Sequence, residues 1–261
     1  GGISNNGVIF RIDPSTWAYT NIHLFLGGHG DGRHPQGDLM VDGHRFYGMT
    51  TQGGTNDSGV VFAMNTDGSH YTNLHEFTSD VDGANPSGGL LKDGAFLYGM
   101  TRGGPTKAGL IFAVPTNGGQ LQILHVFTGT TNDGADPYGS LAKYGSKLYG
   151  FTRFGGTNSQ GVIFSLGGTY TNIHSFGAGG EPYGTPLMVG NTAYGMAFNE
   201  GVSNRGSIFR FDPDSNDTAT AWCAITWIDS GGMGSSLLGD ENGSVIYVQH
   251  NTDALPSDQA L

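Results

Sequence analysis

Two arginines occupy the same motif position in neighbouring repeats of this chain. Arg102 and Arg153 each follow a Tyr-Gly-x-x run. The other repeats carry different residues at this position: Thr51, Phe198 and Asn251. A purely structural position would look alike in similar repeats, so this variation indicates contact with a ligand. Forked guanidinium groups bind carboxylates well, and the pair predicts a local anion site. The alternative is that each arginine pairs with a neighbouring acid, Asp136 or Glu181.

A second variable position follows the proline of a repeated DGxxPxG motif, which we expect to form a turn. Tyr138 and Tyr183 stand there in two repeats. The other copies carry Gln36, Ser87 and Met233. An aromatic face packs on a pyranose while its hydroxyl hydrogen-bonds, so these tyrosines predict contact with a sugar. The alternative is that they fill gaps between neighbouring sheets. The residues before the proline are polar candidates for hydrogen bonding: His34, Asn85, Asp136 and Glu181.

The histidines divide into two groups. Four of them fall in register in the repeats "TNIHLF", "TNLHEF", "QILHVF" and "TNIHSF": His23, His75, His125 and His174. They lie on an outer strand, too far apart for a metal ring, and we expect them to hydrogen-bond between neighbouring sheets. His34 and His250 have no such repeat explanation and are candidate ligand contacts. The aspartates of the DGxxPxG motif predict turn acceptors, with calcium binding as the alternative. We expect no metal and no cofactor.

These residues sit on an internal repeat of about fifty residues. An apolar run ending in Phe recurs, as in Gly7-Val-Ile-Phe10 and Gly59-Val-Val-Phe62, with Phe spacings of 52, 50, 52 and 45. Each copy holds four short runs rich in β-branched and aromatic residues, separated by Gly, Asn, Asp and Pro. Four strands per repeat and five repeats predict an all-β, five-bladed β-propeller with antiparallel strands in each blade. The loops that lead into the inner strands would share one face with those that join the second and third strands.

The ends of the chain predict how the ring closes. The chain opens with the outer strand pair of a blade and finishes with an inner pair, Ser235–Asp240 and Ser244–Gln249. A shared blade would leave no free sheet edge. We expect one domain over 1–261, with the closing blade from 1–30 plus 235–251. The other blades are expected at about 37–79, 88–128, 139–177 and 185–229. Small residues at the inner strands fit a narrow centre.

Composition limits the partners. Glycine accounts for 47 of 261 residues, charged residues for only 13%, and the formal net charge is −11. A surface of that sign repels phosphate backbones and anionic lipid, and no apolar run is long enough to span a membrane. We therefore expect no nucleic-acid partner and no membrane insertion. The single cysteine excludes an intramolecular disulfide. Few charges and no cofactor motif favour a secreted, extracellular protein, and a closed ring favours a monomer.

The motifs resemble a known family. The run "LYGMT…GG…GVVF…LHEF…DGANPSGGL" is similar to the GloVer-type tandem repeat of bacterial secreted and surface proteins, in four good copies and one divergent copy at 221–251. The resemblance implies a β-propeller outside the cytoplasm. It implies no activity and no catalytic residues.

Two functions follow from these residues, with a third left open. The first is a lectin-like propeller that binds a glycan or polysaccharide at several similar loops. The alternative is a polysaccharide-active enzyme. A glycoside hydrolase is disfavoured because the expected inner-strand starts carry one acid, Asp38. A lyase on uronic-acid polymers fits better: Arg102 and Arg153 would neutralise the uronate carboxylate. Its base would come from a small set: Tyr138, Tyr183, His34 or His250. A structural or adhesive module is the third possibility.

Overall fold

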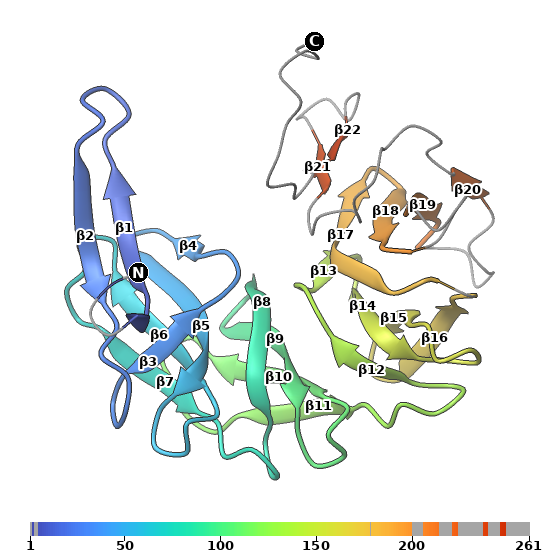
Figure 1. Ribbon diagram of the computed structural model, residues 1–261, viewed down its shortest axis with the longest axis horizontal. Helices are drawn as coiled ribbons and strands as arrows, with labels where there is room; N and C mark the ends of the chain where they lie inside the picture. The colour runs from blue at the N-terminus through green and yellow to red at the C-terminus, as the bar shows by residue number, and fades with distance from the viewer. Residues whose placement is uncertain are drawn as a thin grey trace.

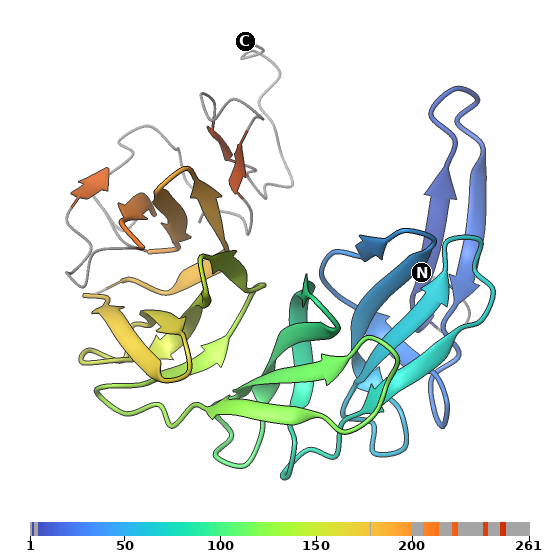
Figure 2. The ribbon, with the colours of Figure 1, turned by 180° about the vertical axis from the view of Figure 1, so that it is seen from behind.

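The computed structural model describes residues 2, 5–177, 179–199, 206–213, 221–223, 237–239 and 246–248. Within them the chain is all-β and contains no α-helix. Every strand pairing is antiparallel. The sheets follow one another in chain order along an arc, from the blue N-terminal hairpin to the red C-terminal strands (Figure 1). The view from behind shows the same succession (Figure 2). This is a propeller-like arrangement of tandem repeats.

Four sheets correspond to the four central repeats. The first contains β3 (Gly32–Pro35), β4 (Met40–Asp42), β5 (Arg45–Gly53), β6 (Val60–Asn65) and β7 (Thr72–Glu76). The second contains β8 (Ala84–Asp93), β9 (Phe96–Gly103), β10 (Leu110–Pro115) and β11 (Gln122–Val126). The third contains β12 (Gly134–Pro137), β13 (Ala142–Tyr144), β14 (Lys147–Gly155), β15 (Val162–Leu166) and β16 (Tyr170–Ser175). The fourth contains β17 (Pro182–Val189), β18 (Thr192–Ala197), β19 (Ser207–Phe211) and β20 (Ala221–Cys223).

Two further strand pairs lie at the ends of the arc (Figure 1). β1 (Val8–Ile12) pairs with β2 (Tyr19–Leu24), and β21 (Leu237–Gly239) pairs with β22 (Ile246–Val248). The β1–β2 hairpin has the same register shift before Phe10 that the outer strand pairs of the first three sheets have before their corresponding phenylalanines. Each of these strand pairs is a separate two-stranded sheet.

The expectation of a turn holds only at the aspartate of the DGxxPxG motif, where the N–H groups of Asp31 and Asp133 bond Gly28 and Thr130, and it is wrong for the rest of the motif. The motif forms the first part of the innermost strand: β3 and β12 pair with the far ends of β5 and β14, and β8 and β17 run continuously through it. The residue before each proline has a positive φ, between 41° and 56°: His34, Asn85, Asp136 and Glu181. This conformation distorts the strand locally without reversing it, and proline is tolerated at such irregular positions.

Neighbouring sheets meet through a backbone contact that occurs four times, which we call the joint. The N–H of the residue before the proline donates to a carbonyl oxygen of the preceding sheet or hairpin, at 2.7–2.9 Å. The donor–acceptor pairs are His34 with Asn6, Asn85 with Ser58, Asp136 with Ala108, and Glu181 with Gln160. The β1–β2 hairpin therefore sits against the first sheet as each sheet sits against the next.

Aromatic rings form the core between sheets. A phenylalanine at the end of each outer strand packs edge-on against the central strand of the following sheet, with ring centroids 5.1–5.5 Å apart. The pairs are Phe25 with Phe62, Phe77 with Phe112, Phe127 with Phe164, and Phe176 with Phe209. Edge-to-face geometry is the preferred arrangement of aromatic rings. The core is therefore a series of layers between sheets.

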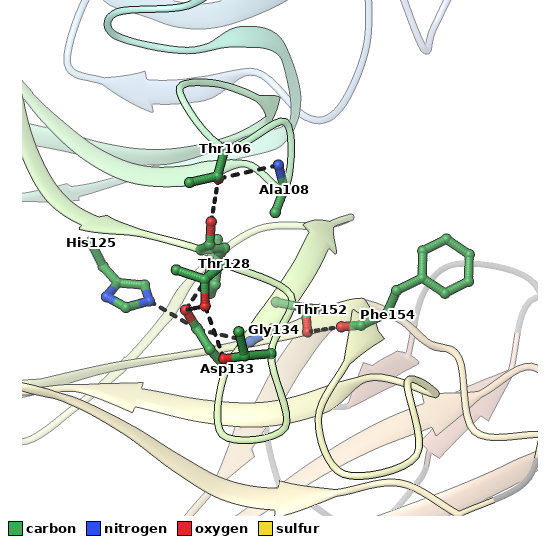
Figure 3. Close-up of polar contacts among 10 residues, drawn as sticks. Thr106, Ala108, His125, Thr128, Asp133, Gly134, Thr152 and Phe154 are labelled. Carbon is green, nitrogen blue, oxygen red and sulfur yellow. Dashed lines mark hydrogen bonds and ion pairs between the residues drawn. The ribbon is translucent and has the colours of Figure 1, made fainter.

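The registered histidines join the outer strand of one sheet to the start of the next. His23, His75 and His125 bond Asp31, Asp82 and Asp133 through Nε2, at 3.3, 2.9 and 3.0 Å. Figure 3 shows Asp133 between His125, Thr128 and Gly134, whose groups bond its carboxylate. Burial opposes ionisation of Asp133, but these hydrogen bonds hold its pKa below the usual value. For these three histidines and their aspartates, the expected roles in inter-sheet bonding and turn acceptance are observed.

Candidate functional site

The structure brings together six of the eight residues that the sequence singles out. They occupy the joints between the second, third and fourth sheets, and we call them the Arg–Tyr cluster: Arg102, Asp136, Tyr138, Arg153, Glu181 and Tyr183. Arg102 ends β9 and Arg153 lies near the end of β14. Asp136 lies in β12, and Tyr183 in β17. Residues up to 45 positions apart in sequence, such as Tyr138 and Tyr183, are thus in contact because consecutive sheets stack through the joint.

Each arginine is paired with an acid from the next sheet. Arg102 forms a two-point pair with Asp136, from Nε to Oδ1 at 2.6 Å and from Nη2 to Oδ2 at 3.1 Å. Arg153 donates from Nε to Glu181 Oε2 at 3.2 Å, and its Nη1 lies 3.9 Å from Asp136 Oδ2. The hydrogen bonds that Arg102 donates to Asp136 raise the pKa of Arg102. The alternative interpretation of the arginines, pairing with a neighbouring acid, is therefore the observed one.

The tyrosines cover these ion pairs. The guanidinium carbon of Arg102 lies 5.1 Å from the ring centroid of Tyr138, and that of Arg153 lies 5.3 Å from Tyr183. The two tyrosine rings meet edge-on at 5.4 Å. Both distances between a guanidinium carbon and a tyrosine ring are within cation–π range. Burial raises the pKa of Tyr183, so its hydroxyl keeps its proton at neutral pH.

Two arginines and two carboxylates give the cluster no net formal charge. The side chains remain accessible: Arg102 is 38% exposed and Arg153 is 31% exposed, against 17% and 20% for Asp136 and Glu181. The cluster therefore offers a ligand fixed polar groups and aromatic edges without an excess of positive charge. Held in place by one another, these groups need little reordering on binding.

The two candidate histidines are not part of the cluster. His34 lies in β3 at the first joint, beside the β1–β2 hairpin. Its backbone N–H donates to the carbonyl oxygen of Asn6, and its carbonyl oxygen accepts from Thr51 Oγ1 at 3.2 Å. Its side chain is exposed. His250 lies outside the described residues.

A cavity of about 270 Å³ lies where the inner strands of four sheets converge. Tyr138 contributes to its wall and so connects it to the Arg–Tyr cluster. The remaining lining comes from polar side chains and glycines: Gln36, Gly37, Asp38, Gly88, Gly89, Gly139, Ser140, Gly184 and Thr185. A Cβ on Gly37, Gly88 or Gly139 would overlap the carbonyl oxygen of the corresponding glycine in the next sheet. The inner strands are therefore packed as tightly as backbone allows, as the small residues in the sequence predict.

The sequence interpretation missed Phe154 and Thr185. The ring of Phe154 is 36% exposed, and its centroid lies 4.8 Å from the guanidinium carbon of Arg153. A signal for it exists, since Phe154 is an aromatic residue at the position where the first repeat has Gln52 and the second repeat has no residue. Thr185 follows the glycine of the motif and faces the cavity.

Among the described residues, no group of three or more His, Cys, Asp or Glu side chains is placed to hold a metal ion. Nor is any helix there long and apolar enough to cross a membrane.

Comparison with known sequences identifies the repeat. The Gloeobacter/Verrucomicrobia repeat matches residues 1–143 and again 91–251, which together span most of the chain. The chain belongs to the Gloeobacter/Verrucomicrobia repeat family. This is the family that the tandem motifs resemble. No curated protein matches the chain.

Solved structures resemble this Gloeobacter/Verrucomicrobia repeat protein at low identity. A putative 6-phosphogluconolactonase from Bacteroides fragilis is 13% identical, with a TM-score of 0.62 over 96% of this chain and 72% of that one. A putative TolB from Agrobacterium tumefaciens is 12% identical, with a TM-score of 0.53 over 83% and 73%. A chain of a nidogen/laminin complex is 16% identical, with a TM-score of 0.51 over 78% and 67%. These likenesses concern the fold alone.

Proposed function

We propose that this protein is a lectin-like propeller that binds neutral glycans through the Arg–Tyr cluster and the adjoining cavity. The observation that carries the proposal is the internal pairing of Arg102 with Asp136 and of Arg153 with Glu181 beneath two tyrosine rings. Sugars are bound by aromatic faces together with fixed polar groups that hydrogen-bond their hydroxyls. A neutral cluster of this kind suits an uncharged sugar.

The same geometry makes the lyase alternative less favourable. A lyase on a uronic-acid polymer needs guanidinium groups free to neutralise the substrate carboxylate. Arg102 would have to release a two-point bond to Asp136, and Asp136 and Glu181 would repel the uronate. Tyr183 has a raised pKa and is a poor base at neutral pH. These facts support binding over elimination.

We propose in addition that the fold is a closed five-bladed propeller, with one blade made from both ends of the chain. Phe10 is 51% exposed, whereas its counterparts in the next three repeats, Phe62, Phe112 and Phe164, are at most 1% exposed. A groove of about 220 Å³, lined in part by Phe10, Ile9 and Leu39, lies between β1 and the first sheet, on the side where the inner strands of a closing blade would pack.

The register of β21–β22 supports the same closure. Leu238 lies opposite Tyr247, as Leu91 lies opposite Tyr98 in the second sheet. By that correspondence β22 takes the place of β9 and pairs with β1 as β9 pairs with β10. Tyr98 lies opposite Ala113, the counterpart of Arg11, so Arg11 is expected opposite Tyr247. Closure would bury Phe10 and remove the free edge of β1.

A disulfide tests the closure. In a Cys223→Ser background, Arg11→Cys with Tyr247→Cys should form an intramolecular disulfide under mild oxidation, because opposed strand residues come within bonding range. Peptide mass mapping would detect it. The pair Thr20→Cys with Tyr247→Cys is the control, since Thr20 lies on the far side of β1 in β2. Oxidation that yields only intermolecular dimers from the first pair contradicts the closed ring.

We further propose that the protein acts outside the cell as a monomer. The low content of charged residues and the absence of a cofactor motif in the sequence support the location. A closed ring without free sheet edges supports the monomer.

Native mass spectrometry tests the proposed function. The probes are neutral tetrasaccharides (maltotetraose, cellotetraose, mannotetraose and xylotetraose) and tetragalacturonate. We expect the wild type to retain a neutral tetrasaccharide intact. We expect Arg102→Ala with Arg153→Ala to weaken that binding more than about tenfold, because the tyrosines lose their support.

Arg33→Ala is the matched control for this experiment. Arg33 forms a two-point pair with Asp57 in the first sheet, away from the Arg–Tyr cluster, and its loss should leave binding unchanged. Failure to retain any neutral sugar contradicts the proposal. Cleavage of tetragalacturonate to fragments lighter by one water than the hydrolysis products would instead support the lyase.

A further inference from the structure

We propose that the central cavity receives one terminal sugar unit, so that the protein recognises the end of a glycan chain. This inference rests on the proposed function and specifies which part of the glycan is bound. Its basis is the size of the cavity, its walls, its polar groups and its connection to the Arg–Tyr cluster.

The cavity is sized for one sugar ring. Its volume of about 270 Å³ lies just below the range of roughly 300–1,000 Å³ that pockets for drug-sized ligands occupy. An oligosaccharide of several units exceeds that space. A single pyranose, being smaller than a drug-sized ligand, fits it.

The walls favour a chain end over an internal unit. Four consecutive sheets contribute their inner strands to the lining, and the glycines of neighbouring strands leave no room for a methyl group between them. A glycan chain therefore has no lateral way out between any two neighbours of these four sheets. An internal unit could reach the cavity only if the polymer bent sharply on both sides of it, whereas a terminal unit can be inserted directly.

The polar groups match the hydroxyls of a sugar. The N–H of Gly89 donates to Ser140 Oγ at 2.6 Å, and the N–H of Ser140 donates to Thr185 Oγ1 at 3.1 Å. These bonds fix the two hydroxyl oxygens and leave their protons to be donated elsewhere. The carboxylate of Asp38, which also lines the cavity, accepts hydrogen bonds. Two donors beside an acceptor suit neighbouring sugar hydroxyls, each of which both donates and accepts.

Tyr138 links this cavity to the remainder of the site. Tyr138 forms part of the cavity wall, and its ring also contacts the guanidinium of Arg102 and the ring of Tyr183. A terminal unit in the cavity would thus place the next unit over the tyrosines, with Phe154 available beyond Arg153. The expected ligand is an uncharged oligosaccharide bound by one end.

The test compares sugars that differ only at their ends. Maltotetraose, cellotetraose and mannotetraose are each titrated by calorimetry in three forms: unmodified, reduced to the alditol at the reducing end, and capped as the 4,6-O-benzylidene acetal at the other end. For the sugar that binds, we expect one end modification to weaken binding more than about tenfold. The other modification should leave binding unchanged.

A cavity-filling variant gives an independent readout. Gln36 lines the cavity and is exposed, so Gln36→Trp should abolish binding while the protein stays folded. His44→Trp, at an exposed turn between β4 and β5, is the control and should bind normally.

The outcomes separate the two proposals. Equal binding of all three forms of a sugar, or normal binding by Gln36→Trp, overturns chain-end recognition and leaves glycan binding intact. Absence of binding by all four unmodified neutral tetrasaccharides, xylotetraose included, overturns both.

Discussion

The first joint and the two joints around the third sheet use the same backbone contact with different side chains. At the first joint, His34 donates its N–H to Asn6, and the nearest arginine pair, Arg33 with Asp57, stays within one sheet. At the later joints the same N–H contact is accompanied by arginines that cross to the next sheet. The shared backbone contact holds the sheets together, and the variable side chains are free to serve binding.

The largest expected effect comes from the close glycine contacts between the inner strands of neighbouring sheets. Gly88 has a φ of +77°, and a Cβ there would overlap the carbonyl oxygen of Gly139. We expect Gly88→Ala to lower the free energy of unfolding by about 3 kcal/mol or more, measured by urea denaturation.

Gly94→Ala is the matched control for this substitution. Gly94 has a positive φ of +58° with no atom within 4 Å of an added Cβ, so it should lose only about 1 kcal/mol. Equal losses for Gly88→Ala and Gly94→Ala would contradict the tight packing at the centre.

The next prediction compares Phe112 in the second sheet with its counterpart Phe10 in the β1–β2 hairpin, which forms one side of the first joint. Phe112 is fully buried, and Phe112→Ala should cost about 3–5 kcal/mol of unfolding free energy. Under the closed-ring proposal, Phe10→Ala should cost nearly as much because β22 and the fourth sheet cover Phe10. A loss below about 1 kcal/mol for Phe10→Ala, read from the same urea curves, would contradict closure.

A smaller effect separates the two kinds of arginine pair. Arg102→Ala leaves Asp136 with only the 3.9 Å contact to Arg153, so we expect a loss of about 0.5–1 kcal/mol after allowing for solvent screening. Arg33→Ala should lose about 0.5 kcal/mol or less, because Asp57 is 55% exposed. Thermal unfolding measures both. A loss several times larger for Arg102→Ala would mean that the cluster is chiefly structural.

The smallest effect concerns pH and the fourth registered histidine. Ala178 replaces the motif aspartate in that repeat, and burial lowers the pKa of His174 from its usual 6.5. The unfolded chain then binds the proton more readily than the folded chain. The contribution of neutral His174 to the free energy of unfolding is therefore complete above pH 6.5 and declines as the pH falls below it. His174→Gln should flatten the stability profile in that window, measured by thermal unfolding at several pH values. An unchanged slope of stability against pH would contradict the assignment of this pH dependence to His174.

The sequence predicts the repeated parts of the structure well, because the same strand pattern occurs in four copies of the repeat. The apolar runs ending in Phe62, Phe112 and Phe164 all become buried central strands. The gathering of Arg102, Tyr138, Arg153 and Tyr183 is also predictable, since equivalent positions in successive repeats must lie side by side.

Other features depend on groups that no single repeat contains. The DGxxPxG motif reads as a turn because Gly, Asp and Pro favour turns. It becomes part of a strand because the preceding sheet supplies an acceptor, such as Ala108 for the N–H of Asp136. The neutralisation of Arg102 likewise requires a residue from the next repeat. Phe154 was missed because its counterpart in the first repeat is the polar Gln52 and the second repeat has no residue at that position.

The most direct test of the account is hydrogen exchange of backbone amides, with and without the neutral oligosaccharide that binds best. The account predicts slower exchange in peptides that cover 134–140 and 181–185, with little change at the first joint in 30–35. Protection confined to the first joint or to the β1–β2 hairpin would contradict the claim that the arginine-bearing joints form the binding site.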